Sequence, residues 1–118
     1  MRRFVFALIA SLPATSALAD PPQIQAVQAT RSGSGYTLSV TLAHPDTGWD
    51  HYADGWRVER EDGTVLGTRV LAHPHVEEQP FTRALGNVAV PEGTTVVFVR
   101  ARCLVDGWRD DRVAVDLR

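Results

Sequence analysis

The chain has 118 residues, of which 44% are hydrophobic and 22% charged, with a single cysteine and a formal net charge of −2. This is the composition of one ordinary globular domain, so it excludes a disordered or collagen-like polymer and a framework of disulfide bonds. The mild negative charge is spread along the chain and does not favour binding to nucleic acid or to anionic lipid.

Residues 1–19 have the pattern of a secretory signal peptide. Two arginines precede an apolar run from Phe4 to Leu12, and Ala17-Leu18-Ala19 supplies the small residues that signal peptidase recognises. We expect cleavage between Ala19 and Asp20. Because the apolar run is shorter than the roughly 20 residues of a spanning helix, and residue 20 is not a cysteine, we expect a mature protein in the periplasm or secreted, with no membrane anchor.

Strand patterns fill the remaining domain, residues 20–118. Alternating or β-branched runs separated by turn formers predict seven strands, at Gln23–Thr30, Tyr36–Leu42, Trp56–Arg60, Thr64–Leu71, Phe81–Leu85, Thr95–Val105 and Arg112–Leu117. We expect no helix. The alternation places these side chains in the core: Tyr36, Leu38, Val40, Leu42, Trp56, Val97, Val99, Ala101, Cys103, Val113, Val115 and Leu117.

Seven short strands in about 100 residues predict an all-β, two-sheet antiparallel sandwich of immunoglobulin-like type. The stretch Leu85–Thr94, followed by alternating Val97, Val99 and Ala101, resembles the corner between the fifth and sixth strands of fibronectin type III domains, although the corner tyrosine is absent. This resemblance implies that fold. The segments GWDHYADGW and HPHVEEQPFTR are also similar to those of small exported bacterial proteins, a resemblance that implies export and no particular activity.

The order of the strands sorts the connections between two ends of the sandwich. In an up-and-down succession, alternate connections lie at opposite ends. One end receives short turns, and the other, which we call the loop-rich pole, receives the long segments 44–52, 72–80 and 106–111 with all four histidines. Because long loops on a rigid sandwich commonly carry binding sites, we expect any ligand at the loop-rich pole.

Three histidines of this pole form a candidate metal site. His73-Pro74-His75 is a closely spaced pair, and His51 comes from a second loop of the same pole. Imidazoles with nearby carboxylates suit Zn or Cu, and we expect no other cofactor. The interpretation that we favour is that these are solvated or capping loop histidines, with the metal site as the alternative. Cys103 shares the inward parity of its strand and is expected to be a free thiol in the core.

Other residues of the pole are candidates for binding a ligand or partner: Trp49, Asp50, Tyr52, Glu77, Glu78, Trp108 and Arg109. The three aromatic residues would either close the end of the core or form a ledge for a sugar, a peptide or a protein. The sequence has no motif with the spacing of a nucleophile elbow, and its adjacent acidic residues are not spaced for acid–base chemistry. We therefore expect that the protein is not an enzyme.

The prediction is therefore an exported, non-catalytic binding or accessory module whose partner is an unknown protein, peptide or small molecule. The alternative is a periplasmic transition-metal binding protein that uses His51, His73 and His75.

Overall fold

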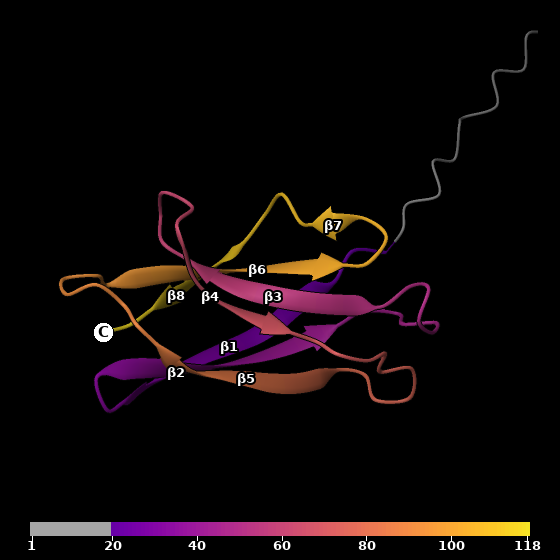
Figure 1. Ribbon diagram of the computed structural model, residues 1–118, viewed down its shortest axis with the longest axis horizontal. Coiled ribbons are helices and arrows are strands. Elements are labelled where there is room, and N and C mark those ends of the chain that lie inside the picture. Colours follow the sequence, from indigo (N-terminus) through magenta and orange to yellow (C-terminus); the bar gives the residue numbers. More distant parts are fainter. Residues whose placement is uncertain (1–19) are drawn as a thin grey trace, which may run out of the picture.

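The computed structural model describes residues 20–118, in which eight strands form two antiparallel sheets (Figure 1). The strands are β1 (Gln23–Ser32), β2 (Gly35–Ala43), β3 (Ala53–Glu59), β4 (Val65–Val70), β5 (Phe81–Val88), β6 (Val96–Cys103), β7 (Gly107–Trp108) and β8 (Val113–Asp116). This part of the chain contains no helix, as expected. The expected signal peptide, residues 1–19, and its cleavage site lie outside the described residues. Among residues 20–118 there is no helix that is long and apolar enough to span a membrane.

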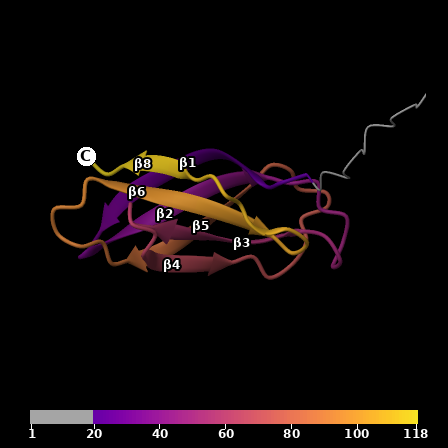
Figure 2. The ribbon, with the colours of Figure 1, turned by 90° about the horizontal axis from the view of Figure 1, so that it is seen from above.

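The two sheets pack face to face as a sandwich. The first has the order β1-β2-β5, and the second has the order β4-β3-β6, with both β7 and β8 paired to β6. Figure 2 shows the layers from above, and β1 lies against β8 at one side of the sandwich while β4 lies against β5 at the other. The all-β, two-sheet antiparallel architecture predicted from the sequence is thereby confirmed.

The number of strands differs from the prediction by one. Each of the seven expected strands occurs, but an eighth, β7, pairs Gly107 with Cys103 and Trp108 with Arg102. Two residues are too few to show a hydrophobic alternation, so the sequence pattern did not predict β7. The sixth strand also ends at Cys103, two residues before its predicted end, because the chain turns there through Gly107, whose φ is +74°.

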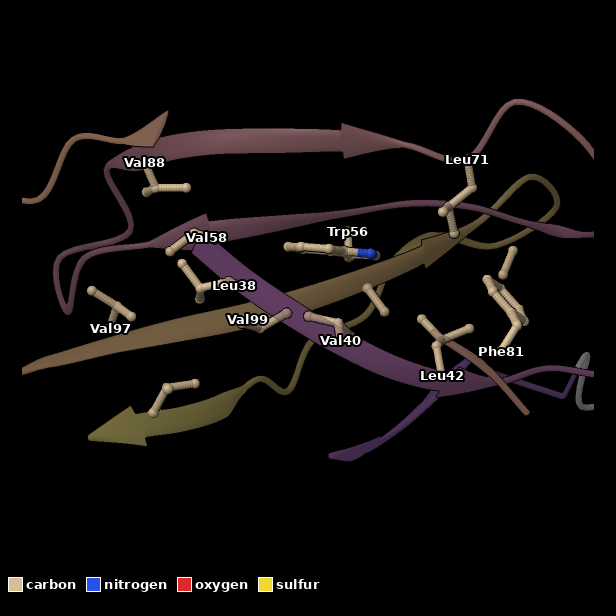
Figure 3. Close-up of a cluster of buried hydrophobic side chains, with 13 residues drawn as sticks. Leu38, Val40, Leu42, Trp56, Val58, Leu71, Phe81, Val88, Val97 and Val99 are labelled. Carbon is tan, nitrogen blue, oxygen red and sulfur yellow. The ribbon is translucent and has the colours of Figure 1, made fainter. Parts of the chain in front are cut away.

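The core lies between the sheets and follows the predicted alternation closely (Figure 3). Leu38, Val40, Leu42, Trp56, Val97, Val99, Ala101, Cys103 and Val115 are all buried. Tyr36 and Leu117 are half-buried and pack against this cluster. The prediction for Val113 was wrong, because it begins the short edge strand β8 and remains 38% exposed.

A buried ion-pair cluster surrounds Glu59, the last residue of β3. Its carboxylate accepts hydrogen bonds from Arg57 Nε (2.7 Å), Arg100 Nε (2.8 Å) and Arg112 Nη1 (3.1 Å). The hydrogen bond from Arg100 is the main cause that lowers the pKa of Glu59 from 4.5 to about 2, against the opposing effect of burial. The ionised carboxylate therefore links β3, β6 and the segment before β8.

The connections lie at two ends, as their parity predicts. The short turns after β1 and β3 and the connection after β5 lie at one end, and the loops after β2, β4 and β6 lie at the other (Figure 1). The loop-rich pole thus brings three distant parts of the sequence together.

Candidate metal centre

Two histidines and the cysteine converge at the loop-rich pole. His44, His51 and Cys103 each place one potential ligand atom within 4.8 Å of the other two. Cys103 Sγ lies 3.9 Å from His51 Nε2, and the rings of His44 and His51 meet edge to face with centroids 4.8 Å apart. Thiolate sulfur and imidazole nitrogen are ligands that Zn and Cu prefer, so the group has the chemistry of a transition-metal site.

The sandwich and one tight turn position these side chains. Cys103 ends β6 and is paired with Ala53 at the start of β3, which places the thiol beside the loop that leads into β3. In that loop His51 N donates to Gly48 O (3.2 Å), and Gly48 has a φ of +153°, which a residue with a side chain rarely adopts. The turn therefore returns His51 to the end of β6.

Asp46 is a buried carboxylate that orients His44. Its Oδ1 accepts hydrogen bonds from His44 Nδ1 (2.5 Å) and Ala53 N (2.9 Å), and its Oδ2 accepts one from His75 N (2.7 Å). A carboxylate behind a ligand histidine fixes both the ring orientation and the tautomer in many metal sites. Asp46 thus occupies the position of such an outer partner and also ties two loops together.

The hydrogen bond to Asp46 leaves Nε2 as the free nitrogen of His44. Because Nδ1 donates its proton to the carboxylate, the neutral ring keeps its lone pair on Nε2. Within residues 20–118 this atom is buried and has no hydrogen-bond partner, on a residue that is only 2% exposed. Leaving such an atom unsatisfied is costly, and a bound metal ion would satisfy it.

The thiol of Cys103 is held by the turn that follows β6. Asp106 N donates to Cys103 Sγ at 3.4 Å, and Asp106 Oδ2 lies 3.5 Å from the same sulfur. Burial raises the pKa of the Cys103 thiol above its usual range. A metal ion that binds the sulfur must therefore displace the thiol proton.

The structure does not bring the expected triad of His51, His73 and His75 together as one ligand group. His51 instead joins His44 and Cys103, which form the one group of potential ligands that residues 20–118 present for a metal ion. The reason lies in the Gly48–His51 turn, which directs His51 toward the end of β6. His73 and His75 do lie close to each other, with ring centroids 4.5 Å apart.

The ring of His75 packs against other side chains of the protein. Its ring is buried and stacked on Phe81 at 3.9 Å, and Arg83 Nη2 lies 3.1 Å from its Nε2. Burial, followed by the charges of Arg83 and His73, lowers the pKa of His75. A guanidinium beside the ring nitrogen disfavours a cation there, while His73 is exposed to solvent.

The aromatic candidates fall into two places. Trp49 is 68% exposed and meets Tyr52 edge to face at 5.8 Å, beside His51 in the loop before β3. Trp108, on β7, contacts the guanidinium groups of Arg57 (4.1 Å from the ring centroid) and Arg102 (5.4 Å). Trp108 is therefore engaged in cation–π contacts, and Trp49 is the aromatic side chain most available to a partner.

The polar candidates mostly take part in ion pairs or face solvent. Arg109 forms a bidentate ion pair with Asp111, and its hydrogen bond lowers the pKa of that carboxyl. Glu78 pairs with Arg83 at 2.9 Å. Asp50 and Glu77 are exposed. Asp50, Glu77 and Glu78 are not members of the group of potential metal ligands in the described residues.

Sequence reasoning did not include His44 and Asp46 among the candidates, and it did not place Cys103 beside the histidines. A signal for the first two was present, because His44-Pro45-Asp46 places an imidazole and a carboxylate two residues apart directly after a strand. The parity of Cys103 predicted its burial correctly, but an inward side chain at the end of a strand can also face a neighbouring loop.

No family model matches the chain, and no solved structure matches it. A protein of Halomicrobium mukohataei named "putative lipoprotein" is 45% identical over 84 residues, which are 71% of this chain and 41% of that relative. The chain thus spans less than half the length of this relative, whose name states no ligand.

Proposed function

We propose that this protein binds a transition-metal ion through His44, His51 and Cys103. The observation that carries the proposal is the buried, partnerless Nε2 of His44, in a group whose other members are an imidazole and a thiol. Asp46 supports it, because a carboxylate on the far nitrogen of a ligand histidine is the usual outer partner in such sites. This ligand set differs from the triad of His51, His73 and His75 that the sequence offered as the alternative to a binding module.

One pair in the group, whose three ligand atoms lie within 4.8 Å of one another, is close to the spacing of a loaded site. Nitrogen and sulfur ligands of a tetrahedral ion, bound at about 2.0–2.3 Å, are about 3.3–3.6 Å apart. Cys103 Sγ and His51 Nε2 are 3.9 Å apart, so a displacement of less than an ångström would bring them to that spacing. His51 is half-buried, whereas His44 and Cys103 are buried, and an ion would therefore enter past His51.

We also infer the setting in which this binding takes place. The relative's name, a lipoprotein, supports export, as do the signal-peptide features of residues 1–19. One sheet contains β1, β2 and β5, and the other contains β3, β4, β6, β7 and β8. This division of the strands supports an immunoglobulin-like, fibronectin type III-like sandwich. We propose a non-catalytic binding protein, whose exposed Trp49 and adjacent Tyr52 are the surface offered to a partner.

Metal titration of the untagged, reduced protein tests the proposal. We expect calorimetry with Zn(II) to show saturable binding of one ion per chain, and Co(II) to give the near-ultraviolet absorption of a cobalt–thiolate bond. His51→Ala should abolish both signals while preserving the fold, because His51 is half-buried in a loop. Cys103→Ser should remove the thiolate absorption in particular.

His73→Ala is the matched control, since it removes an exposed histidine from the same pole and leaves the group intact. Wild-type Zn(II) affinity is expected for this variant. Absence of saturable binding in the wild type, or equal losses in His73→Ala and His51→Ala, would contradict the proposal.

A further inference from the structure

The three converging residues leave one coordination position open. Structural Zn(II) sites hold the ion with four protein ligands in a tetrahedron, whereas His44, His51 and Cys103 supply three. Whether a fourth side chain binds the ion, and which one it is, determines which metal ions the site prefers. The residues around Cys103 Sγ therefore decide the class of metal.

The turn after β6 places a carboxylate beside the sulfur. The Cys103 thiol donates a hydrogen bond to Asp106 Oδ2 at 3.5 Å, a separation that two ligands of one tetrahedral ion, about 3.3–3.6 Å apart, would also have. The backbone supports this placement, because Asp106 N donates to Sγ at 3.4 Å and Gly107, with a φ of +74°, closes the turn. Asp106 lies outside the group of ligand atoms that His44, His51 and Cys103 bring within 4.8 Å of one another. Because it is exposed, its side chain has room to rotate toward an ion held by that group.

The charge of the ligand set favours the same arrangement. Two neutral imidazoles and one thiolate carry a single negative charge, which balances a monovalent ion such as Cu(I). Addition of the Asp106 carboxylate makes two negative charges, which balance a divalent ion. Because His44 and Cys103 are buried, a site of zero net charge avoids the cost of placing an uncompensated charge beside the core.

We propose that Asp106 is the fourth ligand and that the site selects a divalent ion of the Zn(II) class over Cu(I). This inference rests on the proposed metal binding by His44, His51 and Cys103. The exposed carboxylate closes the site from the solvent side, and the Asp46 carboxylate holds His44 from the protein side. Asp106 thereby sets the specificity of a site whose other ligands would serve either kind of ion.

The test compares Zn(II), Co(II) and Cu(I) binding in the wild type and in Asp106→Asn, on the reduced full chain. We expect Asp106→Asn to weaken Zn(II) binding at least about tenfold, to weaken the visible bands of tetrahedral Co(II), and to change Cu(I) affinity by less than about twofold. Asp110→Asn is the matched control, because Asp110 is an exposed acid in the segment directly after β7 whose backbone oxygen, not its side chain, accepts from Arg100. The control should behave as the wild type.

The outcomes separate this inference from the proposed function. Wild-type Zn(II) affinity in Asp106→Asn, or an equal loss of Cu(I) and Zn(II) affinity, would overturn the role of Asp106 while leaving a three-ligand metal site in place. Absence of Zn(II), Co(II) and Cu(I) binding in the wild type would overturn both.

Discussion

Replacement of Glu59 by Gln is expected to lower the free energy of unfolding at pH 7 by about 3 kcal/mol. The variant leaves Arg57, Arg100 and Arg112 without the carboxylate that receives their hydrogen bonds. A fall in the pKa of Glu59 from 4.5 to about 2 corresponds to a stabilisation of the same size, roughly 3 kcal/mol. Urea unfolding followed by tryptophan fluorescence measures the loss.

The contribution of Glu59 also has a defined pH dependence. Because folding lowers the pKa of this carboxyl, its stabilising effect is complete above pH 4.5 and is lost as the pH falls toward 2. The stability difference between the wild type and Glu59→Gln should therefore shrink across that range. Glu92→Gln, which changes an exposed glutamate in the loop before β6, is the control and should match the wild type. Equal stability of Glu59→Gln and Glu92→Gln would show that the cluster contributes nothing.

Replacement of Asp46 by Asn is expected to affect both the fold and the metal centre. Asp46 receives three donors, from His44, Ala53 and His75, and an amide offers only one oxygen. At least one buried donor then faces an NH₂ group, which should cost about 1–3 kcal/mol of stability for each donor left unpaired. Loss of the carboxylate behind His44 should in addition weaken Zn(II) binding about 10–100-fold. Thermal unfolding and Zn(II) calorimetry report the two effects separately.

Asp50→Asn serves as the control for Asp46, because Asp50 is an exposed aspartate in the same loop. It should retain both the melting temperature and the Zn(II) affinity of the wild type. If Asp46→Asn lost stability but bound Zn(II) as tightly as Asp50→Asn, Asp46 would be a structural residue with no influence on the site.

Much of the fold was predictable because each strand of a sandwich alternates hydrophobic residues that face the core with polar residues that face solvent. The inward residues of β2 and β6 repeat at every second position, as Leu38, Val40, Val97 and Val99 do. This period of two predicted both where the strands lie and which of their residues are buried. Parity of the connections then located the loop-rich pole. β7 was not predicted because a strand of two residues forms only through its pairing with β6. Such pairing between separate segments leaves no pattern in the local sequence.

The candidate site was less predictable, since it depends on contacts between distant segments. His51 and Cys103 are brought together by the register of β3 against β6 and by the turn at Gly48, and neither leaves a periodic signal. Alternation also gives the same inward parity to a core residue and to a ligand, and no histidine follows Cys103 in the sequence, so Cys103 was interpreted as a thiol of the core. His44 was overlooked because the conspicuous histidine pair lay in another loop.

X-ray absorption at the zinc edge of the Zn(II)-loaded protein tests the central claim most directly. Coordination by His44, His51, Cys103 and Asp106 predicts one sulfur at about 2.3 Å, two imidazole nitrogens at about 2.0–2.1 Å and one oxygen at about 2.0–2.2 Å. A first shell composed only of nitrogen and oxygen, without the sulfur of Cys103, would contradict the proposed centre.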